Sequence, residues 1–178
     1  MKITYHENKL IDMGSVLLPE EVVQPPHVWF RDPQPGNHYT LAMVDADAEV
    51  PLVRHWIATN IDGSKPGTSF RDNSTLHQYT PYHGPTPPAG TGQHRYVFVL
   101  FSQQTTNQTM TPVLEDPTVH RAYFNLTQFA LDNHLTPVAA SYMLAEHQDG
   151  YDGGYMSRRA SASAAAMKAT QAPRSARF

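Results

Sequence analysis

Residues 84–98 read Gly-Pro-Thr-Pro-Pro-Ala-Gly-Thr-Gly-Gln-His-Arg-Tyr-Val-Phe, and this stretch decides the fold. Its first half, up to Gly92, is a loop, because proline fixes φ and glycine adopts the backbone angles of tight turns. Its second half opens the most hydrophobic run of the chain, which continues to Phe101. This run shows no alternation of polar and apolar residues, so we expect a central β-strand that is covered on both faces.

Further strand patterns flank this stretch. Residues 38–45 and 55–61 are short apolar runs that adjoin turn-forming residues, and residues 138–146 form a last predicted strand. Residues 10–31 contain three prolines, which exclude a helix interior and favour extended chain and edge strands. A helical stripe of apolar residues occurs only late, within residues 120–134. The pattern predicts a mostly-β fold.

The composition limits the class of protein. A chain of 178 residues suits one domain, and 40% of its residues are apolar, as in soluble globular proteins. The absence of cysteine excludes disulfides, thiol nucleophiles and thiolate metal sites, and it fits a reducing compartment, so we expect a cytoplasmic protein. The first residues lack the apolar run of a signal peptide, and no apolar stretch approaches the ~20 residues of a membrane span. We therefore expect at most peripheral membrane contact.

The charge is unevenly distributed. Residues 1–150 contain 8 Lys or Arg and 15 Asp or Glu, a net charge of −7, whereas residues 151–178 contain 5 and 1, a net charge of +4. We expect a monomeric acidic β domain at residues 1–150, followed by a mobile or weakly helical tail rich in Ala, Ser and Arg. An acidic surface repels nucleic acid, so no nucleic-acid partner is expected. Ser161 in the tail follows two arginines, as in sites of basophilic kinases, although such strings also arise by chance.

Two acids and two imidazoles occur near the ends of the predicted strands. Asp45 and Asp47 are two residues apart, and residues i and i+2 of a strand face the same side. Two carboxylates on one face repel each other unless a cation, a proton or strong donors lie between them. His55 opens the next strand, and His94 opens the strand after the loop. An Asp beside a His fixes the imidazole tautomer and raises the share of imidazolium.

This arrangement predicts a small anion pocket. The imidazoles would donate hydrogen bonds to a phosphate while the aspartates hold them from behind, and the glycines of the loop would allow the ligand to approach backbone N–H groups. Tyr96 would add a hydroxyl and a ring wall. Taken singly, Asp45 could be a turn former, and Tyr96 and Trp56 could simply pack in the core. The remaining histidines that we expect to be incidental are His6, His27, His38, His77, His120, His134 and His147.

The same four side chains allow a metal site. Asp and His can bind Zn²⁺ or Mn²⁺, which would suit a hydrolase. The chain has no nucleophile elbow and no His-Glu-X-X-His run, which argues against this alternative.

The order Asp-X-Asp, His, then Tyr-X-Gly-Pro-X-Pro-Pro-X-Gly-Thr-Gly-X-His-Arg-Tyr-X-Phe resembles the signature of the phosphatidylethanolamine-binding proteins. It is carried by Asp45, Asp47, His55, Tyr82, Gly84, Pro87, Pro88, Gly90, Gly92, His94, Arg95 and Tyr96. The resemblance extends from about Leu17 to Glu146. It implies an antiparallel β-sandwich with a few short helices and one small anion pocket, without a cofactor or catalytic residues. The ligand-binding residues that it implies are Asp45, Asp47, His55, Gly84, Pro87, His94 and Tyr96.

The resemblance implies a binding protein rather than an enzyme. Members of the family bind phosphoethanolamine or simple anions; some restrain kinases, some inhibit serine proteases or carboxypeptidases, and plant members control flowering through adaptor proteins. Our first hypothesis is a signalling regulator whose pocket takes a phosphate-bearing headgroup or another phosphorylated group. The second hypothesis is a kinase or protease inhibitor that acts through surface loops.

The chain departs from the family pattern near the first acids. The usual Asp-Pro-Asp-Ala-Pro is replaced by Asp-Ala-Asp-Ala-Glu at residues 45–49, and only seven residues separate Asp47 from His55. We therefore expect a more open and more acidic pocket rim, to which Glu49 contributes. The C-terminal helix that can cover the family's pocket has no clear match, and Tyr151 or Tyr155 could take its place.

Overall fold

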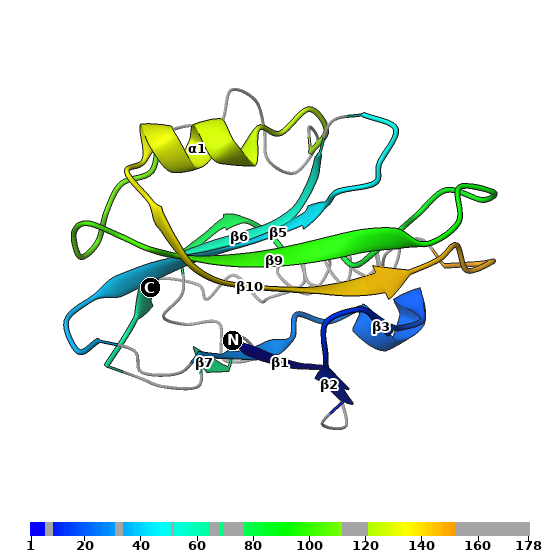
Figure 1. Ribbon diagram of the computed structural model, residues 1–178, viewed down its shortest axis with the longest axis horizontal. Helices are drawn as coiled ribbons and strands as arrows, with labels where there is room; N and C mark the ends of the chain where they lie inside the picture. The colour runs from blue at the N-terminus through cyan, green and yellow to red at the C-terminus, as the bar shows by residue number, and fades with distance from the viewer. Residues whose placement is uncertain are drawn as a thin grey trace, which may run out of the picture.

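The structure is a computed structural model that describes residues 1–5, 9–30, 34–50, 52–64, 68–69, 77–111 and 121–151. These residues form three layers: a small sheet, a larger sheet and one α-helix (Figure 1). The small sheet has the order β2 (Lys9–Ile11), β1 (Lys2–Tyr5), β4 (His27–Trp29), β7 (Thr68–Ser69). The larger sheet has the order β3 (Ser15–Val16), β10 (Thr136–Ala145), β9 (His94–Ser102), β5 (His38–Asp45), β6 (Val53–Asp62), β8 (His77–Thr80). The prediction of a mostly-β fold is confirmed.

All strand pairs of the described residues are antiparallel except one. β3 pairs in parallel with β10, with Ser15 opposite Met143. This pairing fastens the N-terminal part of the chain to its last strand. A short 3-10 helix, η2 (Pro19–Val22), follows β3. The α-helix is α1 (Leu126–Asp132), which lies against the outer face of the larger sheet (Figure 1).

The central strand β9 is covered on both faces, as its sequence predicts. Successive side chains of a strand point to opposite faces. Tyr96, Phe98 and Leu100 pack in the core between the two sheets. Phe101, together with the partly buried Val97 and Val99, packs on the side of α1. The unbroken apolar run therefore contributes side chains to both hydrophobic cores, the one between the sheets and the one beneath α1.

The predicted helix at residues 120–134 is too long. Asn125 caps α1, and its side-chain oxygen accepts a hydrogen bond from the Gln128 N–H at 2.9 Å. Tyr123 has a φ of 58°, which lies outside the α-helical region. The apolar stripe that suggested a longer helix thus includes residues of the chain that lead into the cap.

A β-bulge in β6 sets the direction of one predicted site residue. Met43 of β5 pairs with Trp56, whereas the next residue, Val44, pairs with Arg54. His55 is therefore the extra residue, and bulges of this kind re-aim a side chain. Strict alternation would place His55 and Trp56 on opposite faces, yet both rings pack against tyrosines of the inter-sheet side, His55 against Tyr96 and Trp56 against Tyr82.

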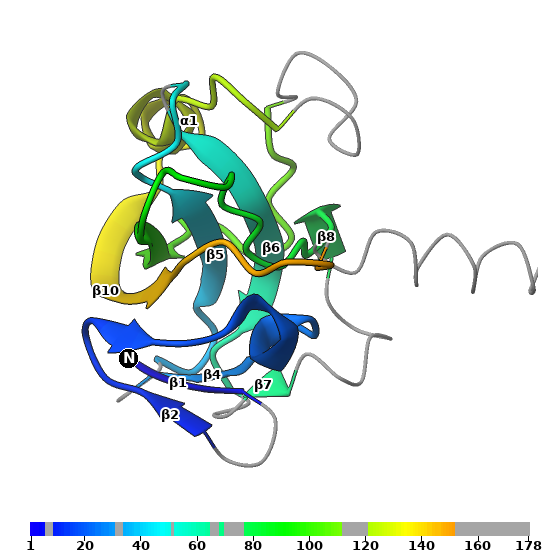
Figure 2. The ribbon, with the colours of Figure 1, turned by 90° about the vertical axis from the view of Figure 1, so that its right-hand side faces the viewer.

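The segment after β10 runs between the loop that precedes β9 and η2 (Figure 2). Gln148 accepts a hydrogen bond from the Glu20 N–H at 3.0 Å through its side-chain oxygen. The predicted tail is outside the described residues apart from Tyr151, so Ser161 and Tyr155 have no structural account. Within the part of the chain that the structure describes, no helix has the length and apolar character to cross a membrane.

Candidate anion-binding site

Three predicted site residues meet where β5 ends and β9 begins. Asp45 is the last residue of β5 and pairs with Tyr96 of β9, and His94 lies two residues before Tyr96 on the same face. The Asp45 carboxylate (Oδ2) lies 2.9 Å from His94 Nδ1. Both residues are buried, with 4% of Asp45 and 2% of His94 exposed. A buried hydrogen-bonded pair of this kind depends on its geometry, because neither group is solvated by water.

The second ring nitrogen of His94 also has a partner within the protein. His94 Nε2 lies 2.7 Å from the Thr91 hydroxyl, which donates in turn to the Pro88 carbonyl at 2.8 Å. Both nitrogens of His94 are thus engaged, by Asp45 and by Thr91. A ligand could reach this imidazole only by displacing Thr91.

His55 lies beside this pair and is neutral at physiological pH. Its Nδ1 donates to the His83 carbonyl at 2.9 Å, and its ring stands edge-on to Tyr96 with 5.1 Å between the centroids. Burial lowers the pKa of His55 to about 4, against the smaller opposing effects of the His83 carbonyl and the Asp45 carboxylate. The expectation that a neighbouring acid makes this histidine more cationic is therefore wrong, because desolvation dominates.

Tyr96 forms the floor of the cluster. It is fully buried, and its pKa is raised, chiefly by burial and then by the neighbouring Asp45 carboxylate. The hydroxyl therefore stays protonated. A hydrogen bond from the Thr86 backbone acts in the opposite direction on the pKa, which places the loop before β9 against this ring.

Asp47 does not join Asp45 on one strand face. β5 ends at Asp45, and the Asp47 N–H donates to Asp45 Oδ1 at 2.9 Å in a turn. The Asp47 carboxylate accepts hydrogen bonds from Arg95 Nε at 2.8 Å and Nη2 at 2.7 Å, and these bonds lower its pKa to about 2. The predicted pair of carboxylates on one face is wrong, because the strand ends too early to keep the alternation.

Arg121 fixes the backbone behind His55. Its Nη1 donates to the carbonyls of His55 at 2.8 Å and Arg54 at 3.3 Å, and its Nη2 donates to the Pro81 carbonyl at 2.9 Å. The His83 N–H donates to the same His55 carbonyl at 2.9 Å. These bonds hold β6 against the segment that leads into the Gly/Pro loop.

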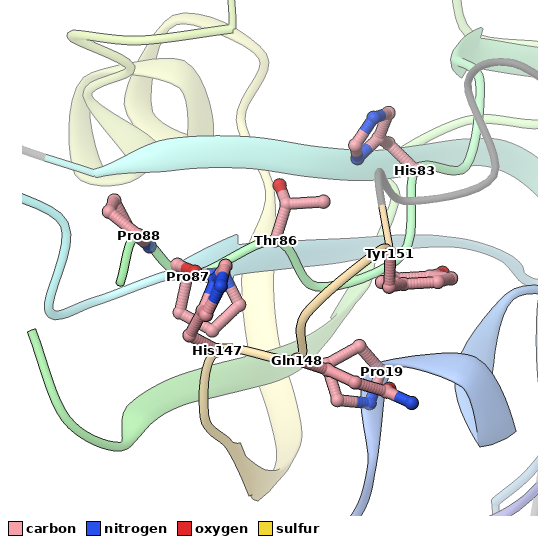
Figure 3. A pocket seen from close by; sticks show the side chains of 8 residues that line it. All are labelled: Pro19, His83, Thr86, Pro87, Pro88, His147, Gln148 and Tyr151. Carbon is pink, nitrogen blue, oxygen red and sulfur yellow. Dashed lines mark hydrogen bonds between the residues drawn. The ribbon is translucent and has the colours of Figure 1, made fainter. Parts of the chain in front are cut away.

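A cavity of about 410 Å³ lies on the other side of this loop (Figure 3). Its volume is within the usual range for small-molecule sites. It is lined by Pro19, His83, Thr86, Pro87, Pro88, His147, Gln148 and Tyr151. Of the residues predicted for the pocket, Pro87 is the one in this lining. Asp45, His55, His94 and Tyr96 lie buried behind it, and His83 and Thr86 touch both regions.

Gly84 is required by a close approach at the edge of the cavity. A Cβ at this position would lie 2.8 Å from the Tyr151 hydroxyl and 3.0 Å from the Val22 carbonyl oxygen. Tyr151 thus packs on the loop and helps to line the cavity, as one of the two tyrosines considered from the sequence.

Two histidines that the sequence analysis did not select line the cavity. His147, expected to be incidental, lies in the lining with Nδ1 3.1 Å from the Pro87 carbonyl. His83, which we had given no role, stands inside the motif between Tyr82 and Gly84, and that position was the available signal. The lining contains no acidic residue, so the acidic rim with Glu49 is not found at this cavity.

The described residues contain no group of three or more His, Cys, Asp or Glu side chains that could hold a metal ion. His94 and Asp45 are bonded to each other and His55 to a carbonyl, which is an arrangement of donors and acceptors rather than of metal ligands.

Comparison with known proteins agrees with this architecture. Residues 6–151 match the family described as phosphatidylethanolamine-binding protein. Protein CENTRORADIALIS from Antirrhinum majus is 34% identical over 158 residues, which cover 83% of this chain and 81% of that protein.

Two solved structures share the fold at lower identity. The phosphatidylethanolamine-binding protein from Plasmodium vivax has a TM-score of 0.70 and 21% identity, with 83% of this chain and 84% of that chain covered. A carboxypeptidase Y inhibitor in complex with its cognate proteinase has a TM-score of 0.67 and 21% identity, with 83% and 82% covered. From the match over residues 6–151 and the plant relative, the chain belongs to the phosphatidylethanolamine-binding protein family.

Proposed function

We propose that this protein is a non-enzymatic regulator that binds phosphate-bearing ligands of the phosphoethanolamine type. The observation that carries the proposal is the 410 Å³ cavity, which is lined by imidazole, hydroxyl and amide groups without a carboxylate. An anion gains from such donors and from the absence of like charge. Three prolines in the lining offer an apolar wall for the short carbon chain of a headgroup.

The buried cluster supports the same proposal indirectly. The Asp45–His94 pair and the His55–His83 bond hold the Gly/Pro loop from behind, so the cavity wall is preorganised before a ligand arrives. Preorganised sites bind more tightly because less ordering entropy is lost on binding. Of the predicted ligand-binding residues, we propose that Gly84 and Pro87 lie at the bound ligand and that Asp45, His55, His94 and Tyr96 act through the loop. Asp47, which pairs with Arg95 at the surface, is proposed to make no contact with the ligand.

The proposal is tested by titrating O-phosphoethanolamine into the protein while the histidine resonances are followed by NMR. Saturable shifts at millimolar ligand are expected, with ethanolamine alone as the control that lacks the anion. Histidine resonances that do not move with phosphoethanolamine or with inorganic phosphate would overturn the proposal.

A second candidate function is inhibition of a kinase or protease through surface loops. The specific observation is a set of exposed apolar side chains around β3, with Met13 73%, Val16 58% and Leu18 52% exposed. Apolar groups gathered in this way are common at protein interfaces. The protease complex of the structural relative makes a protease one class of partner to test.

This second candidate predicts that a partner is retained when the cavity is damaged. The test is a pull-down with wild type, with a double variant Thr86→Ala/His147→Ala, and with Met13→Asp/Leu18→Asp. Loss of a kinase or protease only with the double Asp variant would support binding through this surface, whereas loss only with the cavity variant would refute it.

We also propose the two-part organisation and the compartment. Residues 1–150 are proposed to form the folded unit and residues 151–178 a basic tail, which limited proteolysis tests by cleavage after about residue 151. The lack of cysteine fits the cytoplasm, which a fluorescent fusion tests.

A further inference from the structure

We propose that Asp149 is a site of spontaneous isomerisation to isoaspartate, and that the fold protects Asp62 from the same reaction. Both aspartates precede a glycine, and an Asp-Gly peptide is prone to this reaction because glycine has no side chain to shield its backbone nitrogen. The chain contains such pairs at residues 62–63, 149–150 and 152–153, and the structure describes the first two. The modification does not depend on which ligand the cavity takes.

The reaction uses only the chain and water. The backbone nitrogen of Gly150 attacks Cγ of Asp149 in its carboxylic acid form. A bond forms between this nitrogen and Cγ, the bond from Cγ to the carboxyl hydroxyl breaks, and the hydroxyl leaves with the amide proton as water. A water molecule then opens the succinimide ring at the main-chain carbonyl, returning one hydrogen to the nitrogen and releasing the other as a proton. The chain now continues through Cγ, and the former main-chain carbonyl is a free carboxylate.

The pair at residues 149–150 has the freedom that ring closure requires. The Asp149 side chain is fully exposed, and its Oδ1 lies 3.1 Å from His147 Nε2. Gly150 lies in an exposed turn with a φ of 76°, and a Cβ built on it would meet no atom within 4 Å apart from its chain neighbours. Among the described residues, the Gly150 N–H has no hydrogen-bond partner. The attacking nitrogen is therefore unhindered.

The pair at residues 62–63 is held away from the reaction. Asp62 Oδ1 accepts hydrogen bonds from the Ser64 N–H at 2.8 Å and from the Ser64 hydroxyl at 2.7 Å, which form an Asx turn. The Gly63 N–H donates to the Asn37 carbonyl at 2.9 Å. Gly63 is buried, and a Cβ built on it would lie only 2.7 Å from the Gln34 carbonyl oxygen. Ring closure here would need the carboxylate to leave Ser64 and the nitrogen to leave Asn37, in a turn without spare room.

Isomerisation of Asp149 would disturb the position of Tyr151. The Tyr151 N–H donates to the Gln148 carbonyl at 3.2 Å and closes the turn that contains Asp149 and Gly150. Tyr151 also packs closely on Gly84, where a Cβ on the glycine would lie 2.8 Å from the Tyr151 hydroxyl. Figure 3 shows the Tyr151 ring on the segment that Gln148 begins. Isoaspartate adds one methylene group to the backbone of this turn, so we expect the close packing on Gly84 to be lost.

The experiment incubates the full chain for several weeks at physiological pH and temperature and follows isoaspartate at each site. An isoaspartyl methyltransferase with labelled S-adenosylmethionine measures the product, and electron-transfer fragmentation in a mass spectrometer locates it. Every sample carries Asp152→Glu, because a glutamate closes its larger ring far more slowly and the third pair then adds no signal. Asp149→Glu keeps the charge and blocks the proposed site, and Asp62→Glu is the matched control.

We expect isoaspartate to form at least tenfold faster at Asp149 than at Asp62 in the folded protein. Asp149→Glu should remove the main product, and Asp62→Glu should leave it unchanged. In concentrated urea, where the bonds to Ser64 and Asn37 are absent, the two rates should approach each other because Asp62 reacts faster. Equal rates in the folded protein, or no isoaspartate at Asp149, would overturn the proposal. A rate difference that persists in urea would overturn the protection of Asp62 by the fold.

The effect on Tyr151 has a separate measurement. The isoaspartate form is separated by chromatography, and its backbone amide NMR spectrum is compared with that of the unmodified protein. The Gly84 resonance should shift, because the Tyr151 ring packs on that residue, whereas the resonance of Gly63 in its own turn should stay in place. An unchanged Gly84 resonance would overturn the predicted displacement of Tyr151.

Discussion

The buried cluster and the cavity wall use the same side-chain types in opposite settings. In the cluster, the side chains of His94 and Asp45 are only 3% and 6% exposed and satisfy each other. At the cavity wall, His147 is 34% exposed and its acidic partner Asp149 is in full contact with water. The difference is one of position: the motif side chains Asp45 and His94 are buried behind the loop, while much of the cavity wall comes from residues outside the predicted set.

His94→Ala is expected to lower the free energy of unfolding more than any other variant described below. The variant leaves the Asp45 carboxylate buried without its imidazole partner, and removing one member of a buried pair costs about 3–5 kcal/mol. Urea unfolding measures this loss. The matched variant His147→Ala should cost about 1 kcal/mol or less, because an exposed side chain leaves no buried charge behind. Equal losses for both would contradict the division into support and contact surface.

The second prediction concerns pH. The folded-state pKa of His55 is lowered to about 4, whereas an unfolded histidine has a pKa near 6.5. The unfolded state therefore binds a proton first, and stability is complete above pH 6.5 and declines as pH falls towards 4, by up to about 1.4 kcal/mol per pH unit. Unfolding free energies measured from pH 7.5 to 4.5 test this.

The control for the pH prediction is His55→Asn, which removes the titrating group. Its stability should depend less steeply on pH than that of wild type over the same window, whatever its stability at pH 7.5. Identical slopes would show that His55 is not a buried neutral imidazole.

Arg121→Gln is expected to have an intermediate effect. The change removes a charged donor that serves three carbonyls, and hydrogen bonds to charged groups contribute about 2 kcal/mol. It also removes a positive charge that lowers the pKa of His55, so that pKa should rise. NMR titration of His55 gives the pKa, and Arg95→Gln at the surface is the control. A His55 pKa that stays unchanged in Arg121→Gln would refute the role assigned to this arginine.

Asp47→Asn should have the smallest effect. Its ion pair with Arg95 is at the surface, where solvent and salt screen the charges. We expect the thermal midpoint to change by about 2 °C or less and phosphoethanolamine affinity to remain that of wild type. A loss of phosphoethanolamine affinity of tenfold or more would instead place Asp47 among the ligand-contacting residues.

Strands were more predictable than the helix. The strand at residues 38–45 agrees with β5, and the apolar run from Tyr96 lies within β9, because burial on one or both faces leaves a direct trace in the order of residues. The helix was predicted too long because its stripe counted Tyr123, whose positive φ is set by the turn into the Asn125 cap. A backbone conformation that is set by a turn or by tertiary contacts produces no periodic pattern in the sequence, so periodicity cannot predict it.

Part of the candidate site was predictable because regular strands position it. Asp45, His94 and Tyr96 come together through regular strand pairing, in which every second residue of a strand faces the same side. The predicted position of Asp47 on the same face as Asp45 is wrong because β5 ends at Asp45. His147 reaches the cavity through the Pro87 carbonyl, 60 residues away in the chain, and its own neighbourhood gives no indication of that contact.

The bulge at His55 makes the number of residues at the start of β6 critical for the direction of the His55 ring. β6 begins at Val53, so residues gained or lost before it would leave its register with β5 unchanged. A single residue gained or lost between Val53 and Trp56 would instead rotate the imidazole to the helix side of the sheet, away from Tyr96. The number of residues from Val53 to Trp56 is therefore what fixes the direction of the His55 ring.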